Sequence, residues 1–333
     1  MTLERLAIVG AGSWGTALAV VWANRAPQLT LWGNRAVRVE RMQAARENEL
    51  YLPGVRLPDA VRLTSRLNDC ADAGLIAIAV PSKGLREIVS RLHRVVRDEQ
   101  TVLLSCTKGV EHGSGMRMSE ILAHTFPRNP LLVLSGPNLA AEVARGLPTA
   151  TVLAAADHGY AGEVQKLLGT STFRIYTSDD VAGVELGGAL KNVFAIAAGA
   201  SEGLRLGDNS KAALVTRSLA ELIRLGSAMG GRLNTFHGLS GAGDLVLTCY
   251  SKQSRNHTVG ERLGRGESFE QICAGMQMVA EGVPTAKSAY ECARKLGIDT
   301  PIIDQVHALL YEGKTATRAL EELLGRAPKP EHV

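Results

Sequence analysis

Cysteine is scarce in this sequence, and its distribution excludes several kinds of protein. The five cysteines, Cys70, Cys106, Cys249, Cys273 and Cys292, are scattered over 333 residues, and no two of them have C-x-x-C spacing. An odd and scattered set argues against a disulfide framework and against a zinc site, and it fits a reducing compartment. Clustered His and Cys ligands are also missing, so we expect no metal.

Charge of one sign and long apolar runs are missing as well. The 37 Lys and Arg residues against 33 Asp and Glu residues give a net charge of +4, with no block of like charge. This balance argues against nucleic-acid binding. The N-terminus has no basic segment followed by an apolar segment and a cleavage site, and no uninterrupted apolar run reaches about 18 residues. We therefore expect a cytoplasmic protein without an integral membrane segment.

Apolar residues are plentiful, making up 45% of the chain, and they allow a sizeable core. In the first part of the chain, short β-branched apolar runs alternate with helical patterns. This alternation predicts a doubly wound parallel sheet with helices on both faces. The predicted strands are Leu6–Val9, Leu29–Trp32, Leu75–Val80, Val102–Leu104, Leu131–Leu134, Thr151–Leu153 and Phe173–Tyr176.

The pattern changes near Thr177, and only helical patterns follow. A length of 333 residues suggests about two domains. We therefore expect an α/β domain over residues 1–178 and an all-α domain over residues 179–333. The helices predicted for the second part are Val181–Ala200, Lys211–Met229, Asp244–Tyr250, Asn256–Leu263, Pro284–Leu296, Pro301–Leu310 and Thr315–Leu324.

Three glycines follow the first predicted strand. Gly10, Gly12 and Gly15 have G-x-G-x-x-G spacing, and an apolar helical pattern continues after them. In a strand-turn-helix unit that binds a dinucleotide, the first glycine allows the tight turn, the second lets the backbone approach the pyrophosphate, and the third lets the helix pack on the strand. The helix N-terminus then holds the phosphates. A ligand-free glycine-rich turn is the alternative, but it does not account for this register.

The residues after the second predicted strand bear on the choice of cofactor. NAD-binding units have an Asp or Glu about 20 residues beyond the glycines, which contacts the ribose 2′-hydroxyl. Here the segment Leu31-Trp32-Gly33-Asn34-Arg35 contains no acid. Because a guanidinium pairs with a 2′-phosphate through two hydrogen bonds, Arg35 favours NADP over, or in addition to, NAD. A solvated arginine at a helix start is the alternative.

Two later strand ends carry polar residues, and ligands bind beyond the carboxyl ends of parallel strands. Lys108 follows the strand predicted at Val102–Leu104, so it places a cation in the expected crevice. Gly136 and Asn138 follow the strand predicted at Leu131–Leu134, at a helix start that can present N–H groups to an anion. An ordinary helix N-terminus without a ligand accounts for these residues equally well.

In the second part, Lys191 stands on a ridge of small residues within the predicted helix Val181–Ala200. Gly187 and Gly188 precede it by one turn, and Ala195 follows it by one turn. Each mid-helix glycine costs about 1 kcal/mol relative to alanine, so the pair needs a reason. Either a ligand or another backbone comes close beside Lys191, or the helix packs tightly while the lysine extends to water.

Three other stretches carry polar residues at helix starts. Asp244 lies in the first turn of a helix after a glycine-rich segment, with Thr248 one turn later. Ser254-Arg255-Asn256 combines a cap, a cation and an amide, which suits a phosphate. Glu281 precedes a proline-started helix and is placed to contact ribose hydroxyls. The alternatives are a first-turn acid that complements the helix dipole and ordinary helix entries.

Taken together, these motifs resemble the NAD(P)-dependent sn-glycerol-3-phosphate dehydrogenase family in its bacterial form. They keep the family's order over nearly the whole chain, and the blocks around Lys191 and Asp244 are the most specific of them. The matching segments are Gly10–Ala17, Val80-Pro81-Ser82, Thr107-Lys108-Gly109, Gly136–Glu142, Gly188–Asn192, Gly238–Thr248, Ser254-Arg255-Asn256 and Val279–Gly282. Asn138 stands where many members have Ser or Thr.

The resemblance implies a Rossmann-type domain, an all-α domain and a reaction: dihydroxyacetone phosphate, NAD(P)H and a proton give sn-glycerol 3-phosphate and NAD(P)+, for phospholipid synthesis. It implies that Lys191 is the catalytic acid/base and that Lys108 and Arg255 contact both substrate and cofactor. Implied substrate contacts are Gly136, Asn138, Asp244, Ser254 and Asn256. Implied cofactor contacts, besides the glycines, are Ser13, Trp14, Arg35, Ala140, Val279 and Glu281.

The chemistry agrees with these roles. Hydride addition to a ketone builds negative charge on oxygen, which a lysine within hydrogen-bond reach stabilises and protonates. We hypothesise that Lys108 lowers the pKa of Lys191 by like-charge repulsion, and that Asp244 with Thr248 orients Lys191 and holds a substrate hydroxyl. Another small phosphorylated or acyl substrate, or a non-catalytic NADP-sensing module, is the alternative. Apolar helix faces in the second part permit a homodimer.

Overall fold

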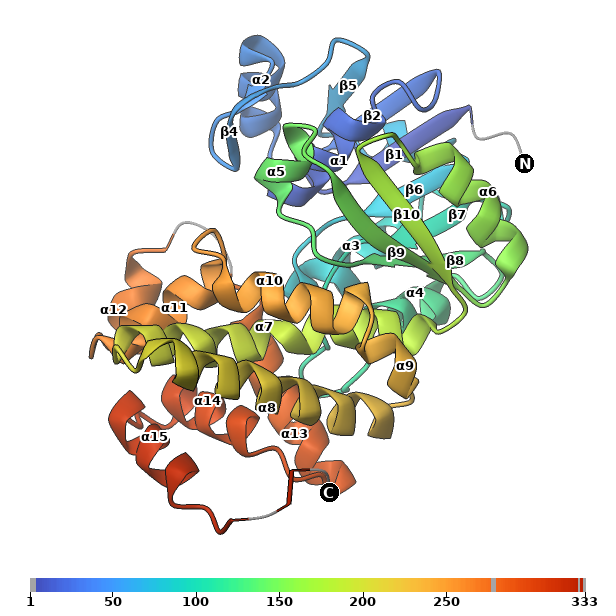
Figure 1. Cartoon of the computed structure of the whole chain (residues 1–333). Helices are drawn as coiled ribbons and strands as arrows, with labels where there is room; N and C mark the ends of the chain where they lie inside the picture. Colours follow the sequence, from blue (N-terminus) through green and yellow to red (C-terminus); the bar gives the residue numbers. More distant parts are fainter. Residues whose placement is uncertain (1–3, 277–279, 329, 332–333) are drawn as a thin grey trace.

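The computed structural model describes residues 4–276, 280–328 and 330–331. The chain forms a sheet with helices on both faces, followed by a group of helices (Figure 1). The change from sheet to helices falls between residues 178 and 181. The division into two domains that fold independently stays a prediction.

Eight strands form the main sheet, and the order of its strands is that of a doubly wound fold, so the expected fold class is confirmed. Strands β1 (Arg5–Val9) and β6 (Leu75–Ile78) pair in parallel. From one edge to the other the strands are β10 (Phe173–Ser178), β9 (Thr149–Ala155), β8 (Leu131–Ser135), β7 (Val102–Ser105), β6, β1, β2 (Gln28–Trp32) and β5 (Val61–Thr64).

One expectation about this sheet is wrong, because β9 runs antiparallel to β8 and β10 runs parallel to β9. The chain between β8 and β9 holds a single short helix, α5 (Ala140–Ala144). Its five residues span about 7.5 Å, whereas the five residues of β8 span about 17 Å. Helix α5 therefore does not return the chain to the far end of the sheet, and the start of β9 lies beside the end of β8.

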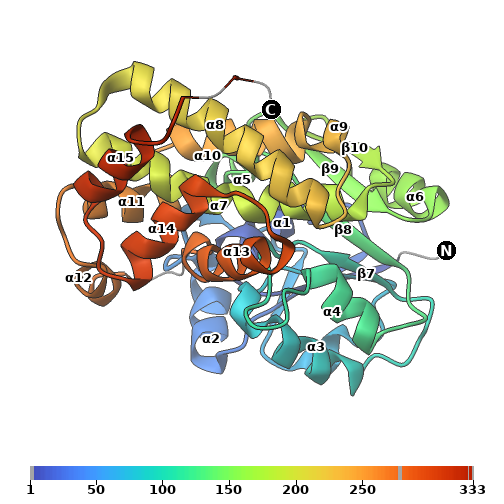
Figure 2. The ribbon, with the colours of Figure 1, turned by 90° about the horizontal axis from the view of Figure 1, so that it is seen from below.

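Both faces of the sheet are buried, and this explains its continuous apolar strands. On β1, Leu6 and Ile8 enter a cluster with Leu18 and Trp22 of α1 (Ser13–Trp22). The alternate residues Ala7 and Val9 enter a second cluster that includes residues of two helices on the other face. Those helices are α3 (Leu85–His93) and α4 (Met118–Thr125), which lie together in Figure 2.

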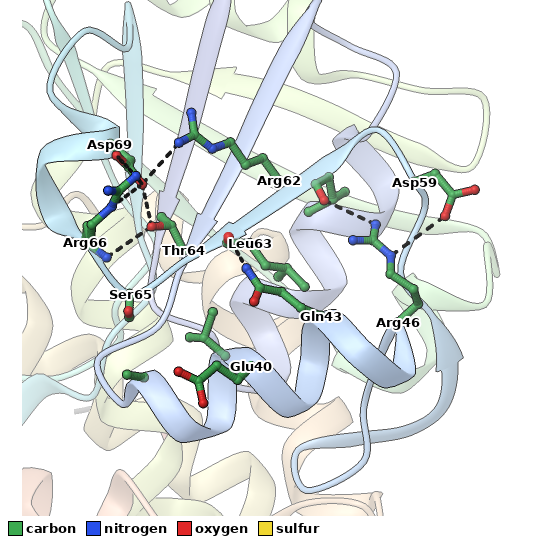
Figure 3. Close-up of a pocket in the computed structure, with 13 residues that line it drawn as sticks. Glu40, Gln43, Arg46, Asp59, Arg62, Leu63, Thr64, Ser65, Arg66 and Asp69 are labelled. Atoms are coloured by element: carbon green, nitrogen blue, oxygen red, sulfur yellow. Dashed lines mark hydrogen bonds and ion pairs between the residues drawn. The ribbon is translucent and has the colours of Figure 1, made fainter.

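The edge strand β5 was not predicted, and neither was the hairpin of β3 (Glu47–Asn48) and β4 (Leu52–Arg56). Beside β5, helix α2 (Ala36–Ala45) and the sheet edge border a polar hollow of about 580 Å³ (Figure 3). The Gln43 side chain donates to the Leu63 carbonyl, and Arg46 donates to that of Val61. Ion pairs line the rest of the hollow, and they are Arg46–Asp59, Arg62–Asp69 and Arg66–Asp69. The hollow is thus a covered sheet edge, with outward carbonyls satisfied.

In the second half, α7 (Val181–Gly203) is the central helix, with other helices around it in Figures 1 and 2. It is long and apolar enough to cross a membrane, but 83% of its most apolar window is buried inside the protein, so it is a core helix. Around it lie α8 (Gly207–Ala228), α10 (Asp244–Tyr250), α11 (Arg255–Gly264), α13 (Gly282–Leu296) and α14 (Pro301–Tyr311). At the periphery of this half lies α15 (Ala316–Leu324), whereas α6 (His158–Leu168) packs on β9 and β10 of the sheet.

Each predicted helix of this half is present, with ends shifted by a few residues. Three short elements were not predicted, because four to six residues carry little periodicity. They are α9 (Leu233–Phe236), a π-helical turn at Leu239–Gly243, and α12 (Phe269–Ala274).

Glycines bring α11 into backbone contact with α7. A Cβ on Gly199 of α7 would lie 2.0 Å from the His257 carbonyl oxygen, and a Cβ on Gly260 of α11 would lie 1.9 Å from that of Ile196. Neither position therefore accommodates a side chain. This packing holds the N-terminus of α11 beside the middle of α7, where Asn256 Nδ2 donates to Asn192 Oδ1 at 2.9 Å.

Candidate active site

Two lysines from different halves of the chain meet one buried carboxylate. Lys191 Nζ, on α7, donates to Asp244 Oδ1 at 2.9 Å and to Thr248 Oγ1 at 2.5 Å. Lys108 Nζ, beyond the end of β7, donates to Asp244 Oδ2 at 2.5 Å and to the Gly136 carbonyl at 3.0 Å. Asp244 is only 1% exposed and Lys191 only 7%. Lys191 therefore does not extend to water, which excludes the alternative given for it.

The electrostatics of this cluster favour a titratable lysine. Burial lowers the pKa of Lys191 to about 8, the charge of Asp244 opposes this effect, and the charge of Lys108 adds to it. Lys108 thus acts in the direction that we hypothesised, but burial is the larger cause. Burial alone would raise the pKa of Asp244, but the two lysines outweigh it and keep that pKa below its usual value. With all three groups charged, the cluster carries a net positive charge and suits an anion.

The glycine pair on α7 makes room for protein. A Cβ on Gly187 would lie 2.6 Å from the carbonyl oxygen of Ser240, in the π-helical turn before Asp244. A Cβ on Gly188 would lie 2.1 Å from Ser135 Oγ and 3.5 Å from Lys108 Cε. The two glycines therefore let the segments that carry Asp244 and Lys108 approach Lys191 closely.

The N-terminus of α11 borders the same region. Ser254 Oγ accepts a hydrogen bond from the His257 N–H and caps the helix, and Arg255 is exposed at its first position. Asn256 bridges two elements, since its Oδ1 also accepts from the Gly282 N–H at 2.8 Å. The chain thus presents a cation beside a capped helix start, which suits a phosphate.

The first turn of the sheet half has the geometry that a dinucleotide requires. Gly10 has φ +124°, and a Cβ there would lie 2.4 Å from the Ala79 carbonyl oxygen. A Cβ on Gly15 would lie 1.8 Å from the Gly10 carbonyl oxygen, whereas nothing lies within 4 Å of a Cβ on Gly12. No side chain caps α1. The N-terminus of α1 and the open space at Gly12 therefore fit a pyrophosphate.

Comparison with known proteins agrees with this geometry. The model of the N-terminal part of NAD-dependent glycerol-3-phosphate dehydrogenase matches residues 5–161, and the model of its C-terminal part matches residues 180–321. The chain belongs to this family. A glycerol-3-phosphate dehydrogenase [NAD(P)+] of Geobacter sulfurreducens is 46% identical over 332 residues, covering 98% of this chain and 99% of the relative.

Solved structures give the same result. The crystal structure of glycerol-3-phosphate dehydrogenase from Coxiella burnetii has a TM-score of 0.93 and 39% identity, covering 97% of this chain and 99% of that one. A 2-dehydropantoate 2-reductase from Geobacter metallireducens shares only the fold, with a TM-score of 0.60 and 15% identity, covering 93% of this chain and 100% of that one. Because the fold occurs with more than one kind of reductase, the substrate must be argued from side chains.

For a glycerol-3-phosphate dehydrogenase, the expected cofactor residues lie near the glycine turn. Ser13 Oγ donates to the Tyr51 carbonyl at 2.7 Å. Trp14 and Ala140 pack against one apolar cluster where α1 meets α5. Arg35 is exposed at the start of α2. The structure thus places these residues around one end of the sheet, and their contacts with a cofactor stay a prediction.

Glu281 lies on the helical side of the same region, where its Oε2 accepts from Ser82 Oγ at 2.6 Å. Burial raises the pKa of Glu281, against the hydrogen bond from Ser82 and the charge of Arg255. The structure therefore brings Glu281 to the loop after β6, at the edge of the sheet where the parallel strands end, and its contact with ribose hydroxyls stays a prediction. Val279, the other cofactor residue expected in this segment, lies outside the described residues.

Gly136 and Asn138 lie beyond the end of β8. Gly136 has φ +156°, and its carbonyl accepts the bond from Lys108. Asn138 Nδ2 donates to Thr151 Oγ1 at 3.0 Å, whereas Asn138 Oδ1 is buried and has no hydrogen-bond partner. A buried acceptor without a partner is uncommon, and it is available to a ligand hydroxyl.

Three residues of this region were missed from the sequence. Tyr51 accepts a hydrogen bond from Arg38 and contacts Ser13 through its carbonyl. Thr151 lies beside Gly136 because β9 is antiparallel to β8. Asn192, directly after Lys191, pairs with Asn256. Of the three, only Asn192 had a sequence signal, since it ends the family-matching segment Gly188–Asn192.

Proposed function

We propose that this chain interconverts dihydroxyacetone phosphate and sn-glycerol 3-phosphate with NAD(P)H. The observation that carries the proposal is the buried Lys191, held by Asp244 and Thr248 and accompanied by Lys108 from the other half of the chain. The family membership of the whole chain supports the same reaction. Supply of glycerol 3-phosphate for phospholipid synthesis fits this activity.

The glycine turn and the N-terminus of α1 hold the dinucleotide in this proposal, with Glu281 near its ribose hydroxyls. When bound, NAD(P)H supplies the hydride. We propose a preference for NADPH, because Arg35 stands at the start of α2 and the segment from Leu31 to Arg35 contains no acid.

Lys191 supplies the proton. With a pKa of about 8 it is mostly protonated at pH 7, yet it loses its proton more readily than an ordinary lysine. As the ketone oxygen gains negative charge, Lys191 stabilises that charge and protonates the oxygen. Lys108 adds a second positive charge, and Asp244 holds both ammonium groups in place. In the reverse direction neutral Lys191 accepts the proton.

The substrate phosphate is assigned to the start of α11. Arg255 provides the cation, and Ser254 and Asn256 are positioned there by hydrogen bonds to α11 and α7. Gly136 and Asn138 approach from the sheet side. A cation at a capped helix start suits a phosphate, which favours a small phosphorylated ketone over an acyl thioester.

The remaining assignments concern the whole molecule. A cytoplasmic location is supported by the five free cysteines, three of which are buried. A homodimer is supported by exposed apolar side chains on the helical half, such as Leu324 at 75% and Leu233 at 54% exposure. Sedimentation of the purified protein tests the dimer.

The reaction is tested by the loss of nicotinamide absorbance with purified protein, dihydroxyacetone phosphate and NADPH or NADH in parallel. The proposal expects rapid oxidation of NADPH, and the ratio of the two rates tests the role of Arg35. Tight dinucleotide binding without oxidation of either cofactor would instead favour another carbonyl substrate, and after that the sensing module.

A further inference from the structure

A buried carboxylate joins the catalytic helix to the sheet half of the chain. Glu185, on α7, accepts hydrogen bonds from the Ser119 N–H at 2.8 Å, from Ser119 Oγ at 2.6 Å and from Arg117 Nη1 at 3.3 Å. Ser119 belongs to the first turn of α4, and Arg117 directly precedes that helix. The Glu185 side chain is 1% exposed and that of Arg117 is 18% exposed. The contact is therefore an ion pair shielded from water.

The partner of Glu185 ends the loop that begins with Lys108. That loop closes on itself through an antiparallel bridge between Val110 and Arg117. Arg117 is also fixed by Glu120, which accepts hydrogen bonds from the Arg117 backbone N–H at 2.8 Å and from Arg117 Nη2 at 2.7 Å. On the other side, Glu185 lies six residues before Lys191 on one continuous helix. The contact between Arg117 and Glu185 thus joins the loop that carries Lys108 to the helix that carries Lys191.

Packing alone does not account for a carboxylate at this position. Burial raises the pKa of Glu185, although the two hydrogen bonds from Ser119 and the charge of Arg117 oppose the effect. The charge of Glu120 adds to it. A buried ion pair is often no more stabilising than apolar residues of the same volume, but its geometry is specific. A requirement for fixed geometry explains why an acid stands here.

We propose that Glu185 is a positioning residue that, through Arg117 and Ser119, holds the Lys108 loop against α7 so that Lys108 and Lys191 share Asp244. The proposal rests on the proposed function of Lys191 as proton donor. It assigns a role in turnover to a residue that has no contact with Lys191, Lys108 or Asp244 in the described hydrogen bonds.

The proposal has a directional consequence for the pH dependence of turnover. The charged groups that face Lys191 are Asp244, which raises its pKa, and Lys108, which lowers it, and the Cys249 thiol also lies near. If the Lys108 loop moves away from α7, the repulsion of Lys191 by Lys108 decreases, and Asp244 forms an ion pair with Lys191 only. Both changes raise the pKa of Lys191. The fall in reduction rate at high pH then moves to higher pH.

The test compares Glu185→Gln with the control Glu120→Gln, which alters the same arginine at a side chain that is 44% exposed. An amide at position 185 removes the charge while keeping the shape. For Glu185→Gln we expect kcat to fall about 10- to 100-fold with the KM for NADPH nearly unchanged, because a small misplacement of reacting groups has effects of this size. We also expect the fall of kcat at alkaline pH to move to higher pH.

Ser119→Ala provides a milder variant, which removes the hydrogen bonds that the Ser119 hydroxyl donates to Glu185 and accepts from Arg117 and keeps both charges. It should show a smaller shift of the alkaline limb in the same direction, and it decides the matter if Glu185→Gln does not fold. The proposal is overturned if kcat of the folded variants falls at the same alkaline pH as kcat of the wild type, whatever the size of their kcat. Failure of wild-type protein to reduce dihydroxyacetone phosphate would instead overturn the proposed function.

Discussion

The two walls of the site are prepared for their ligands in different ways. At the sheet, the glycine turn leaves space: nothing lies within 4 Å of a Cβ on Gly12, and no side chain caps α1. At the helices, the space is filled with paired charges, because Lys191 and Lys108 each donate a hydrogen bond to Asp244. The sheet wall therefore depends on missing side chains, whereas the helical wall depends on side chains that are held in place.

The largest effect should come from the helical wall. Lys191→Ala removes the proton donor, and positioned proton transfer contributes about 10²- to 10⁴-fold, so kcat should fall at least 100-fold. Dinucleotide binding should survive, because the glycine turn is untouched. Steady-state rates and a fluorescence titration with NADPH measure the two quantities.

The matched control for that variant is Lys314→Ala, which removes a paired lysine far from Asp244. Lys314 Nζ bonds Glu322 at 2.8 Å, on the periphery of the helical half. Its kcat should stay within about twofold of wild type, as expected for a surface ion pair. Near-normal turnover in Lys191→Ala would remove Lys191 from the mechanism and end the contrast between the walls.

Substitutions in the sheet wall should have an intermediate effect. Two glycines distinguish loss of stability from loss of NADPH binding. A Cβ on Gly15 meets the Gly10 carbonyl oxygen at 1.8 Å, so Gly15→Ala should lower the free energy of unfolding by about 1–3 kcal/mol. Gly12→Ala meets no atom and should unfold like wild type, yet its methyl group occupies the space assigned to the pyrophosphate. We expect its KM for NADPH to rise at least tenfold, or about 1.4 kcal/mol.

Denaturant unfolding and steady-state kinetics of both variants check this prediction. If Gly12→Ala binds NADPH as well as wild type does, then the open space at Gly12 is not a ligand site. The description of the sheet wall would then be wrong, even if Gly15→Ala behaves as expected.

The sequence predicts those parts of each wall that depend on residues close together in the chain, and it misses those that depend on distant residues. The glycine turn and the helix that carries Lys191 are set by neighbours in the sequence, and both were predicted. The bond between Lys108 and Asp244 joins residues 136 positions apart, so no local pattern contains it. Similarly, β9 is antiparallel because α5 is too short to return the chain, which the strand pattern alone does not reveal.

Short elements were missed for a different reason. β5 has only four residues, and although its apolar and polar residues alternate, so short a stretch carries little periodic signal. Its position is set by pairing with β2 and by the cover from Gln43 and Arg46. Tertiary contacts of this kind override the weak local preference of a short strand.

The smallest of the substitution effects should be a change in cofactor preference. Arg35→Ala removes one exposed cation from the start of α2, so the NADPH to NADH ratio of kcat/KM should fall about 10-fold, equal to about 1.4 kcal/mol. Turnover with NADH should be nearly unchanged. Parallel assays with both cofactors measure the ratio, and an unchanged ratio would show that Arg35 is a solvated surface residue.

The most direct test of the helical wall is the pH dependence of kcat in both directions of the reaction. Reduction needs protonated Lys191, so its rate should fall as pH rises through about 8, the pKa that burial gives this lysine. Oxidation of glycerol 3-phosphate needs the neutral form, so its rate should rise through the same pH. Opposite limbs with one shared midpoint are the predicted result. Two profiles that change in the same direction, or that are flat between pH 7 and about 9, would contradict the role of Lys191 as the proton donor and acceptor.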